Sequence, residues 1–330
     1  AERRRKDLSA FRETGLGTSF LYLSEEQTES TPRVVVGHQR GEIHEYDLDN
    51  LTLAFEFLGH TKTVTAVQTH RKNLLSCSLD QTMRLWSRTE DAPQCLGIFQ
   101  LGSHAVALSP ALAPLPMSQV FVASWDGNVR QVDLKKQSCV NIAQITEDTE
   151  LTSLCTWPDA WDGQVHVFVG TADCRVHHWS FAMAVEPRHQ YNWKCHDMAV
   201  TAIHAIRVGD DTKNDHRLFT GSEDGSIKIW DVTPDSKDKY TLLDDLRGHE
   251  GAVLDISYAT YHTRRWLFSA SRDHIVRTWP FEDIKVRLRE RRAMAQADTE
   301  SRAWTWQWAA QAKKTQKKTP NKGKKPGKKK

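Results

Sequence analysis

Short apolar runs alternate with turn signals along most of the chain, and residues 218–231, LFTGSEDGSIKIWD, show this pattern most clearly. The first five of these residues are apolar or small, and residues 223–225, Glu-Asp-Gly, form a turn signal. A second apolar-rich run follows with Ile227, Ile229 and Trp230. Asp-Gly tolerates the positive φ of a tight hairpin turn. The stretch therefore predicts a β-hairpin.

The same fourteen-residue frame occurs six times. The other five copies start at Val34, Leu74, Val120, Val167 and Leu267, which leaves room for two further strands in each repeat. We therefore predict one four-stranded sheet per repeat. When the six frames are aligned, two positions are occupied by similar residues, and we call each such set a column. The turn column contains Arg40, Asp80, Asp126, Asp173, Asp224 and Asp273. The aromatic column, near the end of the frame, contains Tyr46, Trp86, Val132, Trp179, Trp230 and Trp279.

A Gly-His pair before the hairpin and Trp-Asp at its end resemble the WD-repeat, or β-transducin-like, propellers, and the resemblance covers about Thr18 to Phe281. It implies an all-β propeller with six recognisable blades, seven not being excluded. It also implies that a His, the turn Asp, the Trp and a strand hydroxyl form a buried hydrogen-bond network. Three blades carry the full set: His60, Asp80 and Trp86; His196, Asp224 and Trp230; His249, Asp273 and Trp279.

The hydroxyl of each network has two candidates in the sequence: Ser76 or Ser78, Thr220 or Ser222, and Ser269 or Ser271. A Ser-His-Asp set also permits a catalytic interpretation, but three copies at equivalent positions favour a structural one. The first, third and fourth blades each lack part of the set. We expect apolar packing between neighbouring blades to compensate.

The repeats divide the chain into an N-terminal arm (residues 1–16), the propeller (17–282), a helical and Trp-rich extension (283–312) and a lysine-rich tail (313–330). Composition predicts a helix from about Asp283 to Ala297. In the extension, Trp304, Trp306 and Trp308 alternate as on a strand, although the first and last of them would also share a helix face. We expect them to pack on the propeller or on a partner. A last outer strand for the sixth blade is not evident.

Cysteine usage and apolar patterning indicate an intracellular, reducing compartment, which includes the cytoplasm, the nucleus or nucleolus, and the mitochondrion. The six cysteines are widely spaced and form no framework. The first thirteen residues mix acids with arginines and lack the apolar core of a secretory signal. Prolines interrupt the longest apolar-rich stretch, residues 106–117, so we expect no membrane contact.

Charge is separated along the chain. The net charge is +3, but the tail holds ten lysines and no acid, so the other 312 residues carry 35 basic and 42 acidic side chains, a net of −7. Lysine runs contact phosphates without reading sequence, which favours RNA as a partner. A nuclear import signal and a solubilising tail are the alternatives. The lysines are Lys313, Lys314, Lys317, Lys318, Lys322, Lys324, Lys325, Lys328, Lys329 and Lys330.

Motifs for catalysis or ligand binding are absent from the sequence: it has no phosphate-binding glycine loop, no HExxH and no nucleophile elbow. His166, Cys174, His177 and His178 lie close in sequence, but we expect alternate strand residues to point to different faces, and their spacing fits no ligand pattern. We therefore predict a protein that is no enzyme and takes no cofactor, metal or small-molecule substrate.

Propellers that resemble this chain act as platforms for other proteins, and the face with the hairpin turns is a frequent docking surface. On that face we expect Leu79, Trp125 and Arg272, each directly before a turn position, and Lys62 and Met198 beside it. Two functions follow. One is a scaffold subunit of a ribonucleoprotein such as a ribosome-like particle, and the other is an adaptor in a protein-only assembly for ubiquitin ligation, transport or signalling.

Overall fold

The protein is seen in a computed structural model that describes residues 17–23, 31–50, 52–88, 93–110, 118–157, 164–182, 185–207, 216–233, 239–261 and 264–280. These residues form β-strands joined by turns. Among them no helix is long and apolar enough to cross a membrane. The predicted N-terminal arm, helical extension and lysine tail lie outside the described residues.

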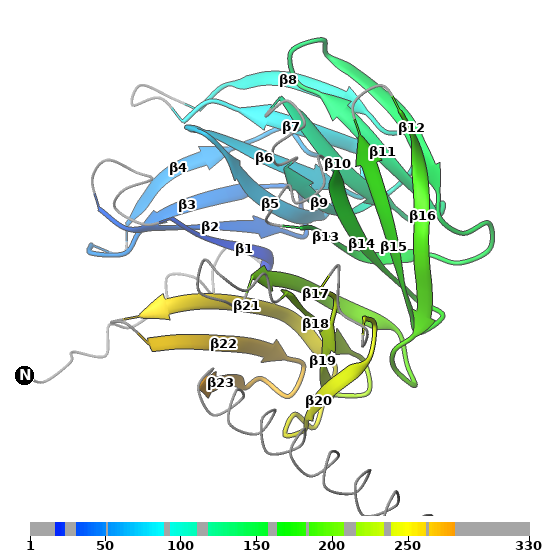
Figure 1. Ribbon diagram of the computed structural model, residues 1–330. Coiled ribbons are helices and arrows are strands. Elements are labelled where there is room, and N and C mark those ends of the chain that lie inside the picture. Colours follow the sequence, from blue (N-terminus) through cyan, green and yellow to red (C-terminus); the bar gives the residue numbers. More distant parts are fainter. Residues whose placement is uncertain are drawn as a thin grey trace, which may run out of the picture. The chain divides into compact units, whose positions relative to one another are not determined.

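Six antiparallel sheets follow one another along the chain, each with its strands in sequence order (Figure 1). Sheet one contains β1 (Gly17–Leu23), β2 (Arg33–His38), β3 (Ile43–Asp47) and β4 (Leu53–Phe57). Sheet two contains β5 (Val64–His70), β6 (Asn73–Ser78), β7 (Thr82–Trp86) and β8 (Cys95–Gln100). Sheet three contains β9 (Ala105–Pro110), β10 (Gln119–Ser124), β11 (Asn128–Asp133) and β12 (Ser138–Gln144).

Sheet four contains β13 (Leu151–Thr156), β14 (Val165–Thr171), β15 (Arg175–Ala182) and β16 (Val185–Lys194). Sheet five contains β17 (Val200–Arg207), β18 (His216–Ser222), β19 (Ile227–Asp231) and β20 (Leu242–Leu246). Sheet six contains β21 (Val253–Tyr261), β22 (Arg264–Ser271) and β23 (Val276–Pro280). Each fourteen-residue frame forms the second and third strands of its sheet. The predicted six-bladed all-β propeller is confirmed. Within the described residues the sixth sheet has three strands, in line with the absence of an evident last outer strand in the sequence.

Two compact units divide the chain. The larger one, Ala1–Ala259 with Leu267–Thr278, holds the first five sheets and most of the sixth. The smaller one, Thr260–Trp266 with Trp279–Lys330, is described only at residues 260–261, 264–266 and 279–280, which are strand ends of sheet six.

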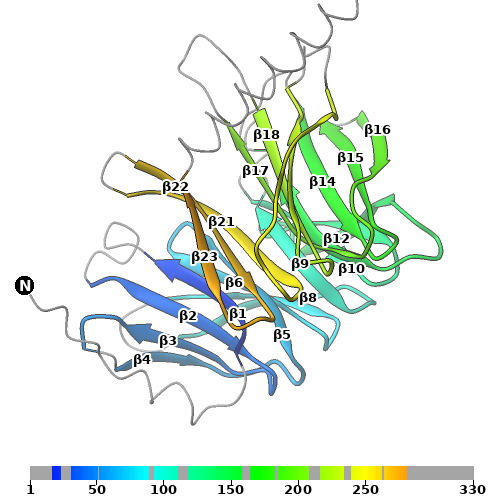
Figure 2. The same ribbon diagram turned by 90° about the horizontal axis from the view of Figure 1, so that it is seen from below.

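In the larger unit, each sheet packs one face on the following sheet, and we call this its leading face. In sheet one, Val35, Ile43 and Phe57 are buried against Val64 and Trp86 of sheet two. The same arrangement joins sheet two to three, three to four, and four to five. The first strands of these sheets, β1, β5, β9, β13 and β17, are therefore successive neighbours. Figure 2 shows the same sheets from below.

Hydroxyl groups on the first strands connect successive sheets. Thr65 in β5 donates a hydrogen bond of 2.8 Å to the backbone oxygen of Ala105 in β9. Thr152 and Thr201 make the equivalent bonds to the backbone oxygens of Val200 and Val253. Each of these threonines is the second residue of its strand, so one sequence position repeatedly satisfies a backbone acceptor of the next sheet.

Candidate functional site

The hairpin turns between the second and third strands share one backbone conformation. The residue after the turn column has a positive φ in every frame: Gly41, Gln81, Gly127, Cys174, Gly225 and His274, with values from 64° to 96°. A Cβ added at Gly225 would lie 2.9 Å from the backbone oxygen of His249, in the connection that leads into sheet six. Turns and connections therefore form one surface, which we call the turn face.

A polar network supports this face in sheet two. The Trp86 indole N–H donates to Ser76 Oγ at 2.8 Å, and Ser76 Oγ lies 2.7 Å from His60 Nε2. His60 Nδ1 lies 2.8 Å from Asp80 Oδ2. An indole N–H only donates a hydrogen bond, and a carboxylate only accepts one. Each group therefore donates to the next, from Trp86 through Ser76 and His60 to Asp80, and this order fits a neutral imidazole. Thr82 completes it by donating to Asp80 Oδ1 at 2.7 Å.

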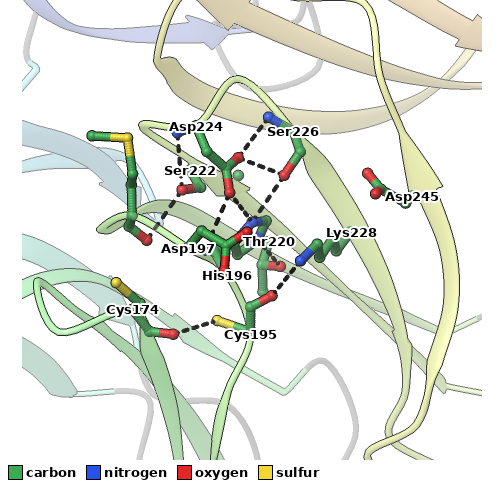
Figure 3. A network of polar contacts seen from close by, with 12 residues as sticks. Cys174, Cys195, His196, Asp197, Thr220, Ser222, Asp224, Ser226, Lys228 and Asp245 are labelled. Atoms are coloured by element: carbon green, nitrogen blue, oxygen red, sulfur yellow. Dashed lines mark hydrogen bonds and ion pairs between the residues drawn. The ribbon is translucent and has the colours of Figure 1, made fainter.

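Sheet five repeats this arrangement, and Figure 3 shows its His196, Thr220, Asp224 and Ser226. Trp230 donates to Thr220 Oγ1 at 2.9 Å, Thr220 Oγ1 lies 2.7 Å from His196 Nε2, and His196 Nδ1 lies 3.3 Å from Asp224 Oδ2. The Ser226 hydroxyl donates to the same carboxylate, as Thr82 does in sheet two. In sheet six, His249 lies 2.8 Å from Asp273 and 2.7 Å from Ser269. Ser76, Thr220 and Ser269 are thus the hydroxyls of the three networks.

The other candidate hydroxyl in each sheet has a different partner. Ser78 donates to the backbone oxygen of Lys62 at 2.9 Å, and Ser222 donates to that of Met198 at 3.2 Å. Ser271 donates to the backbone oxygen of Gly251 at 2.9 Å. One hydroxyl per sheet therefore completes the buried network, while the next one along the strand fixes the backbone of the turn face.

The remaining three sheets replace the network with other pairs. In sheet one, His44 Nδ1 lies 3.2 Å from the Tyr46 hydroxyl. In sheet three, Asp126 pairs with Arg130. His104 lies 2.5 Å from the backbone oxygen of Leu79 instead. In sheet four, the carboxylate of Asp173 accepts a hydrogen bond from Thr171.

Burial lowers the pKa values of His60 and His196, although the neighbouring carboxylates oppose the shift. Burial acts to raise the pKa of Asp80, but hydrogen bonds from Thr82 and His60 outweigh it and hold the pKa below its ordinary value. The same balance, with bonds from Ser226, lowers the pKa of Asp224. The networks of sheets two and five therefore contain neutral imidazoles and ionised carboxylates at neutral pH.

Although these networks contain Ser-His-Asp sets, their hydroxyls and imidazoles are buried. Ser76 and Thr220 are 0% exposed, and His196 is 1% exposed. A nucleophile needs access to its substrate, and here each hydroxyl already accepts an indole N–H. The arrangement supports the turn face and offers no substrate site at these positions.

Of the five residues predicted to dock proteins, Trp125 and Met198 expose large apolar side chains, with 41% and 48% of their surface accessible. Arg272 and Lys62 are exposed, and Leu79 is half-buried. His104 brings two of the turns together, because it contacts the Leu79 backbone and packs edge-on against the Trp125 ring at 5.0 Å. Met198 and Arg272 belong to the turn face of sheets five and six.

A buried histidine cluster was not expected from the sequence. His166 Nδ1 lies 2.9 Å from His178 Nε2, and His178 Nδ1 lies 2.7 Å from the Tyr240 hydroxyl of the next sheet. The expectation that these residues point to different faces fails for His166 and His178, which are diagonal neighbours on paired strands, because Ser180 lies opposite His166 and Phe168 lies opposite His178. Only the pairing register of β14 and β15 reveals this. Among the described residues, no three His, Cys, Asp or Glu side chains are grouped to hold a metal, and all six cysteines are free.

Comparisons with known proteins agree with this geometry. The model of the WD domain, G-beta repeat, matches residues 51–87, 187–231 and 240–280. The WD40 β-propeller domain of Doa1 superposes with a TM-score of 0.62 over 80% of this chain and 79% of that one, at 16% identity. This chain is a WD-repeat β-propeller. Proteins of this family generally act as scaffolds that bind other proteins.

Two curated relatives add similarity over part of their length. The protein transport protein sec13 of Aspergillus fumigatus is 39% identical over 64 residues, which is 19% of this chain and 21% of that protein. The ribosome biogenesis protein YTM1 of Podospora anserina is 24% identical over 214 residues, which is 54% of this chain and 41% of that protein. Each match thus spans less than half of the relative.

Proposed function

We propose that this WD-repeat propeller is a non-catalytic scaffold subunit of a ribonucleoprotein, which docks proteins on its turn face and contacts RNA through its C-terminal lysines. The observation that carries the proposal is the charge separation between a body of net −7 and a tail of ten lysines. Similarity to a ribosome biogenesis protein over more than half of the chain supports the same particle class and favours the nucleus or nucleolus as its location.

Protein docking is assigned to the turn face because large side chains are exposed there on a rigid support. Trp125 is part of a hairpin turn, and its backbone N–H donates to the backbone oxygen of His104 at 3.0 Å. Its ring packs against the His104 ring, yet 41% of its surface remains accessible. Trp and Arg are the residues most enriched in binding hot spots. Trp125 and Arg272 are therefore the side chains whose truncation we expect to weaken partner binding most.

RNA binding is assigned to residues 313–330 because the body repels a phosphate backbone. At physiological salt this repulsion extends over a Debye length of about 8 Å. Eighteen extended residues span at most roughly 60 Å. The tail therefore reaches RNA beyond the range of the repulsion, and each lysine that neutralises a phosphate makes the affinity more sensitive to salt.

Filter binding of ribosomal RNA at several salt concentrations tests this assignment. We compare the full chain, a chain lacking residues 313–330, and a chain of full length in which the ten lysines are replaced by glutamine. The full chain should bind with an affinity that falls steeply as salt rises, and both variants should lose binding. Equal affinities for the three chains, or a flat salt response, would exclude RNA docking by the tail.

A second candidate is an adaptor in a protein-only assembly, with the tail as a nuclear import signal. The similarity to the protein transport protein sec13, the highest identity of the matches described above, favours it. Removal of the tail distinguishes the two functions, because each predicts the loss of a different property. An import signal would change the nuclear fraction of the protein in cells and leave the purified chain without affinity for RNA.

A further inference from the structure

A basic residue occupies the same position of the third strand in every sheet: His44, Arg84, Arg130, His177, Lys228 and Arg277. In sheet two the residue opposite it on the fourth strand is Ile98. In the other four sheets with a described fourth strand, the opposite residue is an acid or an amide: Glu56, Asn141, Asn192 and Asp245. Sheet two therefore lacks the polar neighbour that this position has elsewhere.

The other four sheets pair or neutralise this basic group. In sheet one, His44 Nε2 lies 3.2 Å from Glu56 Oε1. In sheet five, Lys228 Nζ donates to a backbone oxygen at 2.8 Å, and in sheet three the Arg130 guanidinium pairs with a carboxylate. In sheet four, burial lowers the pKa of His177 to about 4, so this imidazole is neutral at pH 7 and needs no counter-charge.

Arg84 differs from these groups because its charge has no such partner. Its side chain is half-buried, and its Nε–H has no hydrogen-bond partner among the described residues. The Cζ atom lies 5.7 Å from the centre of the Trp86 ring, and a Cβ added at Gly59, between β4 and β5, would clash with Nη1. Glu45, on the leading face of sheet one, is already bound by two other arginines, at 3.1 and 2.7 Å. The guanidinium is therefore held in place while a counter-charge is lacking in the described part of the chain.

Exposed aliphatic side chains border this guanidinium. Ile98, opposite Arg84, is 52% exposed, and Leu96 on the same strand is 46% exposed. Leu58, directly before Gly59 in the connection from sheet one, is 62% exposed. Their strand β8 is the outer edge of sheet two and contains neither a charged residue nor proline, the features that usually protect a strand edge from association. The edge thus combines apolar surface with one unpaired cation.

We propose that Arg84, Leu58, Leu96 and Ile98 form a second protein-docking site, which binds an acidic side chain flanked by aliphatic residues of a partner. A carboxylate supplies the missing counter-charge and can accept two parallel N–H bonds from a guanidinium. The aliphatic neighbours would exclude water from that pair. An RNA backbone fits less well, because phosphate contacts of RNA are made by several cations together. The site shares no residue with those assigned to docking on the turn face.

One substitution within the chain should block the site without harming the fold. Ile98→Glu places a carboxylate opposite Arg84, as Glu56 lies opposite His44 in sheet one. The new side chain should occupy the guanidinium and leave the melting temperature equal or higher. The matched control is Val140→Glu, which adds the same charge to an exposed position of β12 where the opposite residue is Gln131.

Selection of short displayed peptides on the purified full chain tests the proposal, with a glutamate fixed at the centre of each peptide and the flanking positions randomised. Affinities of the selected peptides are then measured by fluorescence anisotropy. Peptides with aliphatic residues beside the glutamate should bind Ile98→Glu and Arg84→Gln about tenfold more weakly or worse, and Val140→Glu with unchanged affinity. Replacing the peptide glutamate by glutamine should cause the same loss on the unmodified chain.

The proposal would be overturned if every selected peptide bound Ile98→Glu as tightly as the unmodified chain. Peptides that depend on Arg84 but tolerate glutamine in place of glutamate would overturn it as well. A fall in RNA affinity of Arg84→Gln, without any peptide that depends on Arg84, would assign the guanidinium to a phosphate instead. Thermal melts accompany each variant, and should Arg84→Gln fail to fold, the comparison of Ile98→Glu with Val140→Glu decides.

Discussion

At the scale of single residues, the repeated columns of the sequence identify the network groups, but they do not determine which hydroxyl joins them. Ser76 and Ser78 lie two apart on one strand and therefore share a face. Their roles separate only in three dimensions, where Ser76 meets the Trp86 indole and Ser78 meets the backbone of Lys62. The His166–His178 contact was missed for the same reason, because it depends on the register between two strands.

The value of the indole hydrogen bond is measurable with a pair of matched substitutions. Trp230→Phe removes the donor to Thr220, whereas Trp179→Phe changes an indole whose N–H has no partner among the described residues. The first should destabilise the fold by about 1 kcal/mol more than the second. Trp230→Ala removes the buried ring as well and should cost about 3 to 5 kcal/mol. Chemical denaturation of the variants measures these differences, and equal costs for the two phenylalanine variants would exclude a stabilising bond.

Acid should weaken the propeller in two stages. The folded pKa values of His60 and His196 lie below the ordinary 6.5, so the unfolded chain binds these protons first. The free energy of unfolding should therefore fall as pH drops below about 6.5. Burial lowers the pKa of His177 to about 4, which adds to the same stage. The lowered pKa values of Asp80 and Asp224 add a second loss below about pH 3.8. Thermal unfolding at pH 7, 6 and 5 checks the first stage, which a constant melting temperature would contradict.

At the scale of elements, the frames predicted the second and third strands of every sheet, because their alternation is local. A fourth strand for sheet six is not evident from the sequence, because the residues after Pro280 have the composition of a helix. Within the described residues that sheet has three strands. Contacts between sheets likewise depend on small residues whose role the sequence alone does not show.

Glycine at one such position allows sheets five and six to approach each other. A Cβ added at Gly221 would lie 2.6 Å from Val253 Cγ1 and 3.0 Å from Ile256 Cδ1. Gly221→Val should therefore overpack this interface and destabilise the fold by about 1 to 3 kcal/mol. Ala270→Val changes the equivalent residue of sheet six, which is only half-buried, and should cost much less. Denaturant midpoints of the two variants provide the comparison, and equal losses would show that the close approach is unimportant.

At the scale of the whole molecule, a rigid acidic platform and a cationic tail divide the work between two kinds of partner. The platform fixes the exposed Trp125 through a backbone hydrogen bond to His104 and the edge-on contact of the two rings. The tail cannot form a core, because it combines lysine with Pro and Gly and has no apolar run. Removal of either part should therefore leave the other functional.

The composition of the complex purified with this chain tests that division most directly. Protein and RNA are measured after purification with the full chain, with a chain lacking residues 313–330, and with a Trp125→Ala, Arg272→Ala variant. The full chain should co-purify with both proteins and RNA. The shortened chain should keep its protein partners and lose the RNA that binds it directly. The double variant should lose protein partners, while its purified form still binds RNA. A full-chain complex without RNA, or one whose proteins and RNA are unchanged in both variants, would contradict the proposed ribonucleoprotein scaffold.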